Sequence, residues 1–410
     1  MASPTIFTDP KAYTDPETWH PVAAKLCRDD PVPRIEVEGF DPFWAVTKHA
    51  DVIDIERQPE RFPNTIESVL APAHMRPKNG GMQIPFKTLI HMDGAQHRAY
   101  RNLTNDWFKP GALKRVLEPR VVQLARKYVN RMAELGGACD FALDVARYYP
   151  LQVIMSVLGV PESDEPLMLD LTQKLFGADD PDFGAGAEPE QRMKVLMDLV
   201  GYFQRMTAER RAQPGDDLAT VIANGRVEGA ALPDLETLGY YIIVATAGHD
   251  TTSSTLVGGL EALVRRPEQL RALQRDLSGV DNAVEEMIRW VTPVRHFMRY
   301  AEEDCELRGR KIAKGDGLLM SYLSANRDEE VFADPFEFDV ARANASSHLA
   351  FGTGVHFCLG ANLARLELAA FFRELLPRLE SIELTGPTEY TAATFVGAPK
   401  RVPIRYRLRG

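Results

Sequence analysis

The segment FGTGVHFCLG, residues 351–360, places a single cysteine among glycines directly before a helical pattern. Gly352, Gly354 and Gly360 surround Cys358, and glycine permits positive φ angles and close backbone approach, so this loop is shaped to lie against something flat or bulky. A cysteine at a helix N-terminus is stabilised as a thiolate by unpaired N–H groups and the helix dipole. Such a thiolate is a nucleophile or a metal ligand, whereas a neutral Cys358 is a small buried hydrophobic residue.

The residues beside Cys358 argue against two other kinds of site. Phe357 occupies the position of the third glycine of a dinucleotide-binding GxGxxG loop. His356 is the only metal-ligating residue next to the cysteine, which is too few for a structural zinc site. A Cys358 nucleophile activated by His356 stays open, although nothing else in the sequence supports a catalytic triad. A haem-free cysteine hydrolase is therefore one hypothesis for this chain.

A second candidate site lies in a long apolar helical pattern. A start signal at Pro233–Asp234 and a stop at 265–267 predict one helix of about 32 residues, or ~48 Å. Its middle, YYIIVATAG, is apolar on nearly every face, which indicates burial all round. Asp250 and Thr251 follow within AGHDTT. A carboxylate in apolar surroundings must be paired or serve a purpose.

Charged residues recur at helical spacings elsewhere in the chain. Glu286 and Arg289, in EEMIR, are three residues apart, and taken alone they form an ordinary surface pair. His97 and Arg101, in HRAYR, lie one turn apart on one face of a helix. Arg299 follows TPVRHFM in a predicted strand. Each of these charges, taken singly, is also explained as a solvated surface group.

Length and composition predict an ordinary globular protein. The chain has 410 residues, 45% hydrophobic and 26% charged, and a formal net charge of -10 that argues against general nucleic-acid binding. Four cysteines lie far apart without a CxxC spacing, so no disulfide framework is expected. Neither a signal peptide nor an apolar run of membrane-spanning length is present. We expect a cytoplasmic protein with no membrane anchor.

The elements that must position these residues are mostly helical. Two short strands are predicted on either side of a turn at 39–41, followed by a helix from residue 49. Residues 61–91 hold four prolines and a Gly-Gly pair and are predicted to form a long loop, and 177–191 a mobile connection. Short strands are also expected at 305–312 and 401–408. No shift in composition marks a boundary, so we expect one large domain over 1–410, mainly α with small β-sheets.

The complete pattern Phe351-Gly-x-Gly-x-His-x-Cys358-x-Gly360 resembles the haem-binding loop of the cytochrome P450 family. The resemblance implies that fold, with haem b (iron protoporphyrin IX) lying between the long central helix and the cysteine loop. It implies that Cys358 is the axial thiolate of the haem iron, donating electron density that favours cleavage of the O–O bond.

Other strings resemble the same family. AGHDTT is similar to its oxygen-activation signature, which implies that Asp250 and Thr251 relay protons. The ExxR pair Glu286 and Arg289, together with Arg342 in FEFDVAR, resembles a buried structural network. Four further residues match positions that bind the haem propionates: His97, Arg101, Arg299 and His356.

The substrate is the less specific part of the resemblance. VATAGHDTTSS and SANRDEEVF look most like the bacterial terpineol-hydroxylating branch of the family. The resemblance implies a distal pocket that is lined by Ile243, Ala247, Val294, Phe297 and Val396. These side chains suit a small hydrophobic molecule, of the terpenoid or alkyl-aromatic type. The loop at 61–91 and the 170–195 region are expected to open for its entry.

No flavin or iron–sulfur motif is present, so the electrons must come from another protein. The branch implies an acidic [2Fe-2S] ferredoxin with its reductase, O2 as co-substrate, and a monomeric enzyme. We predict a basic docking patch formed by Arg98, Lys109, Lys114 and Arg365. Two alternatives remain besides the hydrolase: a haem-thiolate enzyme that uses peroxide directly, and a non-catalytic haem-binding sensor or carrier.

Overall fold

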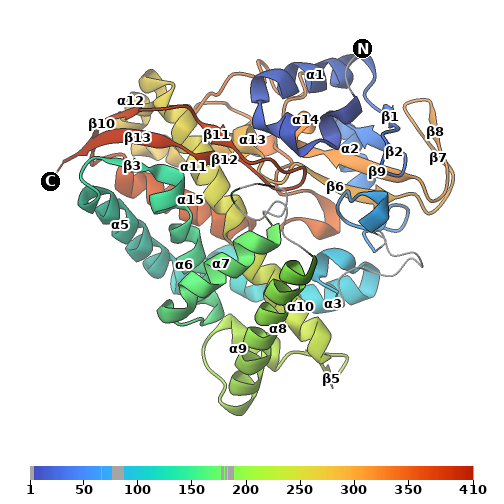
Figure 1. Cartoon of the computed structure of the whole chain (residues 1–410), viewed down its shortest axis with the longest axis horizontal. Coiled ribbons are helices and arrows are strands. Elements are labelled where there is room, and N and C mark those ends of the chain that lie inside the picture. The colour runs from blue at the N-terminus through green and yellow to red at the C-terminus, as the bar shows by residue number, and fades with distance from the viewer. Residues whose placement is uncertain are drawn as a thin grey trace.

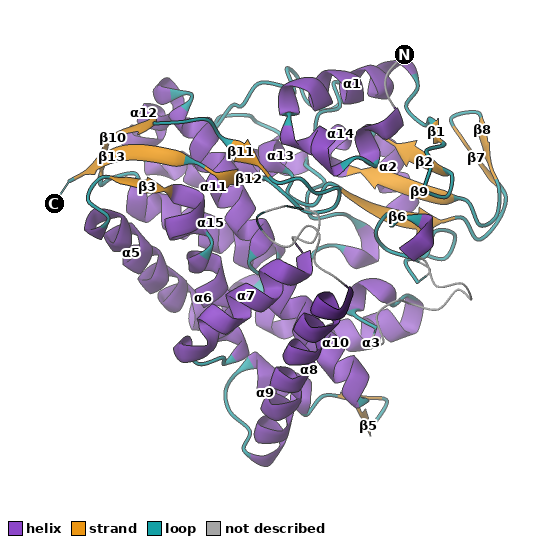
Figure 2. Cartoon of the chain, viewed as in Figure 1, coloured by secondary structure: helices purple, strands orange, loops and turns teal. Residues whose placement is uncertain are grey.

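Helices dominate the computed structural model of the chain, and small sheets lie at two of its edges (Figures 1 and 2). The structure describes residues 4–65, 67–75, 87–180 except 177–179, residue 182, and 189–409. The helices of the first half are α1 (Pro16–Asp29), α2 (His49–Glu56), α3 (Gly94–Thr104), α4 (Pro110–Ala112), α5 (Glu118–Glu134), α6 (Tyr148–Leu158), α7 (Glu165–Phe176) and α8 (Pro189–Ala212). Those of the second half are α9 (Leu218–Ala223), α10 (Asp234–Ala247), α11 (Asp250–Val264), α12 (Pro267–Arg275), α13 (Val280–Val291), α14 (Tyr322–Ala325) and α15 (Ala361–Leu375).

The larger sheet lies near the N-terminus and has the strand order β1-β2-β9-β6 (Figure 1). Its strands are β1 (Arg34–Ile35), β2 (Phe43–Val46), β6 (His296–Tyr300) and β9 (Gly317–Ser321). β2 and β9 run parallel, with Phe43 opposite Gly317, and the other neighbours are antiparallel. Strand β6 carries Arg299, so this sheet fixes one of the predicted site residues.

A three-stranded sheet lies toward the C-terminus, in the order β10-β13-β3. Its strands are β3 (Ala138–Asp140), β10 (Leu379–Leu384) and β13 (Pro403–Leu408). Three two-stranded ribbons complete the described strands: β4 (Arg226–Val227) with β5 (Ala230–Ala231), β7 (Cys305–Leu307) with β8 (Arg310–Ile312), and β11 (Glu389–Tyr390) with β12 (Pro399–Arg401). The strands predicted on either side of the 39–41 turn, at 305–312 and at 401–408 are confirmed.

The largest buried apolar cluster is shared by α5, α6, α10, α11, α13 and α15. Helix α15, which follows the cysteine loop, packs on α5, α11 and α13. Its buried face, including Leu368, Phe371, Phe372 and Leu375, recurs at the spacing of an amphipathic helix. The cysteine loop therefore leads into a helix that is held by the main core.

The prediction of one continuous long helix is wrong in one respect. The helix is divided into α10 and α11 at Gly248 and His249, where the regular hydrogen-bond series is interrupted. A Cβ at Gly248 would lie 2.5 Å from Cγ1 of Ile154 on α6, so only glycine allows α6 to pack this closely. The break lies directly before Asp250 and Thr251.

The loop predicted at 61–91 contains two short 3-10 turns, Ala73–Met75 and Leu89–His91, while residues 66 and 76–86 lie outside the described residues. Most of the predicted connection at 177–191 also lies outside them. Asp180 within it is buried and forms an ion pair of 2.8 Å with Lys400 on β12. In the described part of the chain, no helix is long and apolar enough to span a bilayer.

Candidate functional site

The cysteine loop is fixed by backbone contacts and by two glycines with positive φ. The amide N–H of Cys358 donates to the carbonyl oxygen of Phe351 at 2.9 Å. Gly354 has a φ of 67°, and a Cβ there would lie 2.5 Å from the carbonyl oxygen of Glu56. The close approach of α2 thus requires glycine at this position.

The surroundings of the Cys358 thiol act on its pKa in opposite directions. Burial is the largest effect and raises this pKa above its ordinary value, although the backbone N–H groups of Gly360 and Ala361 and the charges of Arg101 and Arg365 act to lower it. Even so, Cys358 keeps accessible surface, and a Cβ built on Gly360 meets no atom within 4 Å. The loop therefore presents a cysteine that keeps accessible surface and has anion-stabilising N–H groups and arginines near its thiol.

Helix α3 brings two of the predicted propionate residues to this loop. Nη2 of Arg101 donates a hydrogen bond of 2.6 Å to the carbonyl oxygen of Phe357. The rings of His97 and His356 lie with their centroids 4.2 Å apart, and Nε2 of His356 lies 3.0 Å from Oδ1 of Asp93. Burial, together with the neighbouring charges of His356 and Arg101, lowers the pKa of His97 to about 4.

Arg299 reaches the same loop through an acidic residue that was not among the predicted site residues. Glu56, at the end of α2, accepts a hydrogen bond of 2.9 Å from Nη2 of Arg299. It also accepts one from the hydroxyl of Tyr322 and one of 2.8 Å from the amide of Thr353. The buried Glu56 carboxylate therefore ties the cysteine loop to strand β6 and offsets the charge of Arg299.

This set of donors fits a haem. Cys358 offers one sulfur ligand with accessible surface. The cationic or hydrogen-bonding side chains of His97, Arg101, Arg299 and His356 can bind carboxylates, of which a haem carries two. Among the described residues, no group of three or more His, Cys, Asp or Glu residues could hold a metal ion on its own.

The acid–alcohol pair begins helix α11. Asp250 is partly exposed, with 27% of its side-chain surface accessible, and its Oδ1 lies 3.1 Å from Nε2 of the buried His249. The Thr251 hydroxyl donates to the carbonyl oxygen of Ala247 at 3.2 Å. Ala247 itself is exposed although Val244, Ala245 and other neighbours are buried. A polar pair thus borders accessible surface in the middle of a buried helix.

The predicted pocket residues come from three segments. Ile243 and Ala247 lie four residues apart, on one face of α10. Val294 and Val396 form an isolated antiparallel bridge, and the ring of Phe297 lies 5.3 Å from that of Phe395. The structure therefore brings Val294, Phe297 and the 395–396 segment together. Ile243, Val294, Phe297 and Val396 are each only half-buried.

Glu286, Arg289 and Arg342 form one buried network. The carboxylate of Glu286 lies 2.6 and 2.7 Å from two nitrogens of Arg289, and 3.1 and 3.2 Å from Nε of Arg342. Both arginines also donate to backbone carbonyl oxygens between residues 326 and 337. The network therefore holds the irregular segment before the cysteine loop against α13.

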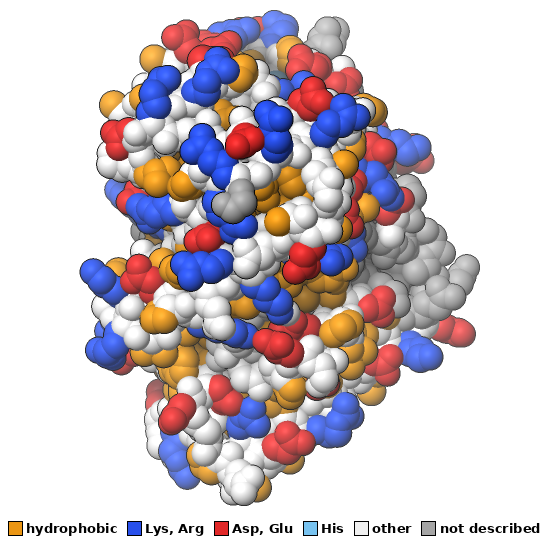
Figure 3. Space-filling view, turned by 90° about the vertical axis from the view of Figure 1, so that its left-hand side faces the viewer, with side chains coloured by type: hydrophobic (Ala, Val, Ile, Leu, Met, Phe, Trp, Pro, Cys, Tyr) orange, Lys and Arg blue, Asp and Glu red, His pale blue; other side chains and the backbone are white. Residues whose placement is uncertain are grey.

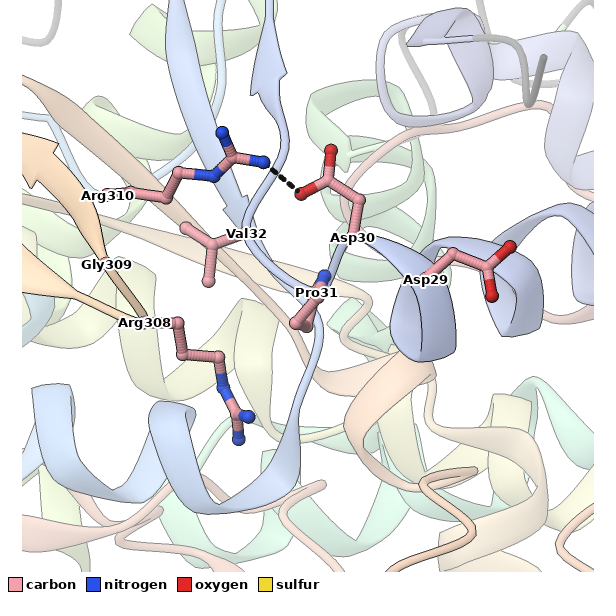
Figure 4. A pocket seen from close by; sticks show the side chains of 7 residues that line it. All are labelled: Asp29, Asp30, Pro31, Val32, Arg308, Gly309 and Arg310. Carbon is pink, nitrogen blue, oxygen red and sulfur yellow. Dashed lines mark hydrogen bonds and ion pairs between the residues drawn. The ribbon is translucent and has the colours of Figure 1, made fainter.

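A surface pocket between the end of α1 and the β7–β8 ribbon is a weaker candidate (Figure 4). Its charges are already paired, since Arg310 binds Asp30 at 3.0 Å and Arg308 binds Asp51 on α2. It contains no nucleophile or residue with a strongly shifted pKa among those that line it. We therefore assign it no chemistry.

The chain is similar to known proteins along nearly its whole length. The family model for cytochrome P450 matches residues 73–390. The chain is 44% identical to cytochrome P450-terp from a Pseudomonas species, over 97% of this chain and 95% of that protein. It is 30% identical to linalool 8-monooxygenase from Pseudomonas putida, over 97% of both. The crystal structure of CYP108D1 from Novosphingobium aromaticivorans superposes with a TM-score of 0.90, at 39% identity and covering 100% of both chains. The chain therefore belongs to the cytochrome P450 family of monooxygenases.

Proposed function

We propose that this protein is a haem-thiolate monooxygenase that hydroxylates a small hydrophobic substrate of the terpenoid or alkyl-aromatic type. The observation that carries the proposal is the Cys358 loop, in which two backbone N–H groups and two arginines act against burial to favour a sulfur anion, at a cysteine that keeps accessible surface. Within one domain, Cys358 would hold the iron of haem b. His97, Arg101, Arg299 and His356 would bind its propionates.

When bound, the haem supplies the activation of O2 and the insertion of one oxygen atom into a C–H bond. The second oxygen atom leaves as water, which consumes two protons and two electrons. Asp250 and Thr251 would hold and transfer those protons. The Asp250 carboxylate keeps accessible surface, and the Thr251 hydroxyl can turn from the Ala247 carbonyl toward a bound water.

The substrate class is supported by the pocket residues and by the relatives. Ile243, Ala247, Val294, Phe297 and Val396 offer only apolar surface, so they would orient a substrate by shape. Two relatives bear names that refer to terpenoid chemistry, cytochrome P450-terp and linalool 8-monooxygenase. A monoterpene alcohol is therefore the first substrate to test.

A [2Fe-2S] ferredoxin, reduced by its reductase, would deliver the electrons. Of the predicted docking residues, Arg98 and Lys114 are exposed, and Lys109 is exposed beside Asp106. Arg365 is different, because Glu285 neutralises it through contacts of 2.6 and 3.1 Å and its guanidinium lies over Phe351. We therefore assign docking to Arg98, Lys109 and Lys114, and to Arg365 a role in holding α15 to α13.

The face near α5 and the C-terminus is unsuited to an acidic partner (Figure 3). Lys, Arg, Asp and Glu side chains alternate there without a field of one sign, and several form pairs, such as Arg405 with Glu383 and Arg126 with Glu374. Paired exposed charges of this kind contribute little to attraction over a distance.

Turnover with purified components tests the function. Protein, ferredoxin, reductase, NADH and O2 are incubated with monoterpene alcohols or alkyl-aromatic compounds, and hydroxylated product is quantified against NADH consumed. We expect product whose new oxygen derives from 18O2. Product formed only with hydrogen peroxide would instead establish the peroxide-using alternative, and haem binding without product from any route would establish a sensor or carrier.

A further inference from the structure

His249 lies at the break between α10 and α11 and is completely buried. Its Nδ1 lies 3.0 Å from the carbonyl oxygen of Ala245. Its Nε2 lies 3.1 Å from Oδ1 of Asp250 and 3.2 Å from Oγ1 of Thr172 on α7. One ring thus joins α10, the acid of the proton relay and a separate helix that lies beside them (Figure 1).

Two of the three partners can only accept a hydrogen bond from His249, and the third, the Thr172 hydroxyl, has other acceptors for its own proton. A backbone carbonyl and a carboxylate accept hydrogen bonds and cannot donate. The Thr172 hydroxyl can give its proton to the carbonyl of Met168 at 2.8 Å or of Leu169 at 3.2 Å, which leaves a lone pair facing the ring. A neutral imidazole has one N–H and would leave one of its nitrogens facing an acceptor without a proton.

Protonation of both ring nitrogens gives Nδ1 a proton for the Ala245 carbonyl, and gives Nε2 one proton that faces the Asp250 carboxylate, with the Thr172 hydroxyl beside it. Burial by itself lowers the pKa of His249, but the Asp250 charge, its hydrogen bond and the Ala245 carbonyl outweigh burial and raise the pKa above its ordinary value. Asp250 is the charged group that faces the ring; α7 contributes the Thr172 hydroxyl, and α6 contributes the apolar Ile154 beside Gly248. Among the described residues, no other cation lies within ion-pair distance of Asp250.

We propose that His249 is a positioning residue for the reaction: as a buried imidazolium it holds the Asp250 carboxylate in one orientation, and it links that carboxylate to α7 through Thr172. The inference rests on the proposed role of Asp250 in moving protons. Because Asp250 has a fixed cation on one side and accessible surface on the other, it can receive a proton only from the accessible side. Loss of the imidazolium would free the carboxylate to rotate.

The charge state is tested first, on the intact protein and without turnover. The ring nitrogens of 15N-histidine-labelled protein are observed by NMR in the reduced, carbon monoxide-bound form, which is diamagnetic. We expect one histidine with two N–H signals at pH 8. Both signals should be absent in His249→Gln, and in Asp250→Asn the same ring should carry only one N–H. The absence of such a histidine in the wild-type protein would overturn the proposal. If His249→Gln does not fold, Asp250→Asn alone gives the decision.

The positioning role is tested by a double-mutant cycle in the turnover assay. We expect His249→Gln to lower the product formed per NADH on the order of 10-fold, to increase the solvent isotope effect and to shift the pH profile. In the Asp250→Asn background the same change should have no further effect. His49→Gln is the matched control, because His49 is another buried histidine, 2.8 Å from a carbonyl oxygen, that contacts no site residue.

Two results would contradict this role. Equal losses from His249→Gln in both backgrounds would mean that the histidine acts independently of Asp250. An unchanged isotope effect and pH profile with a lowered melting temperature would reduce His249 to a structural residue. If the wild-type protein binds haem but makes no product, the proposed function fails, whereas the NMR result still decides whether the His249–Asp250 ion pair exists.

Discussion

Nη2 of Arg101 lies 2.6 Å from the carbonyl oxygen of Phe357, the residue directly before Cys358. A single guanidinium on α3 thus fixes the loop and places a positive charge near the sulfur. The positive charge favours a deprotonated cysteine, and the hydrogen bond holds that cysteine in one position.

Replacing Arg101 by methionine should weaken both effects while keeping an apolar side chain of similar length. We expect the free energy of unfolding to fall by about 1.5 kcal/mol, because a charged donor to the loop is lost. The pKa of Cys358 should rise, so a larger share of the reduced carbon monoxide complex should lack the thiolate spectrum. Arg98→Met, one turn earlier and exposed, is the control and should change neither quantity.

Glu286→Gln should be far more damaging than the loss of a surface ion pair. Arg289 is completely buried and Arg342 nearly so, and both would lose their carboxylate. We expect a loss of about 3–5 kcal/mol in urea unfolding. The exposed pair Arg131–Glu134, 3.8 Å apart, is the comparison: Glu134→Gln should cost no more than about 0.5 kcal/mol. Similar losses at the two sites would contradict the assigned structural role.

The Glu285 carboxylate should make stability depend on acidity. Burial raises its pKa, but hydrogen bonds from His348 and Arg365 outweigh this and bring it down to about 2. The stabilisation is therefore complete above the ordinary value of about 4.5 and is lost as the pH falls toward 2. Urea unfolding should be measured at several pH values from 6 to 3. The free energy of unfolding of wild type should exceed that of Glu285→Gln at pH 6, and this difference should shrink as the pH falls. A difference that stays constant would refute this.

Gly248→Ala should be destabilising because of the contact with Ile154. The new Cβ would lie 2.5 Å from Cγ1 of Ile154, and overpacking of this kind costs about 1–3 kcal/mol. Combination with Ile154→Ala should make the cost of the glycine change smaller. Gly201→Ala on α8 is the control, since its nearest atom is a flexible arginine nitrogen at 3.6 Å, and it should be neutral or slightly stabilising. Additive effects of the two changes at 154 and 248 would contradict the packing argument.

Whether a site residue could be predicted depends on how far apart in the sequence it and its partners lie. The Cys358 loop, the helix after it and the alternating strands arise from patterns within about 20 residues, and these were predictable. Glu56 and Asp93 were not, because their partners Arg299 and His356 lie 243 and 263 residues away. An isolated acid at the end of a short helix carries no local signal for such a partner.

The break at Gly248 and His249 shows the same limit. The apolar pattern predicted one continuous helix, whereas the close packing of Ile154 on α6 against Gly248 lies at the break and involves another helix. Similarly, the sequence predicted Arg365 to be an exposed basic residue on the helix after Cys358. Only the fold places Glu285 of α13 beside it. Charge on a helix face predicts exposure only when no acidic residue from another element packs against it.

Whether Cys358 is the iron ligand is measured most directly by the absorption spectrum of the reduced protein with and without carbon monoxide, recorded for wild type and for Cys358→Ser. Cys305→Ser, at a half-buried cysteine in strand β7, is the control. We predict that wild type and Cys305→Ser show the long-wavelength Soret band of a thiolate-ligated carbonyl complex and that Cys358→Ser does not. Haem bound without that band in wild type, or the same band in Cys358→Ser, would contradict the assignment of Cys358 as the iron ligand.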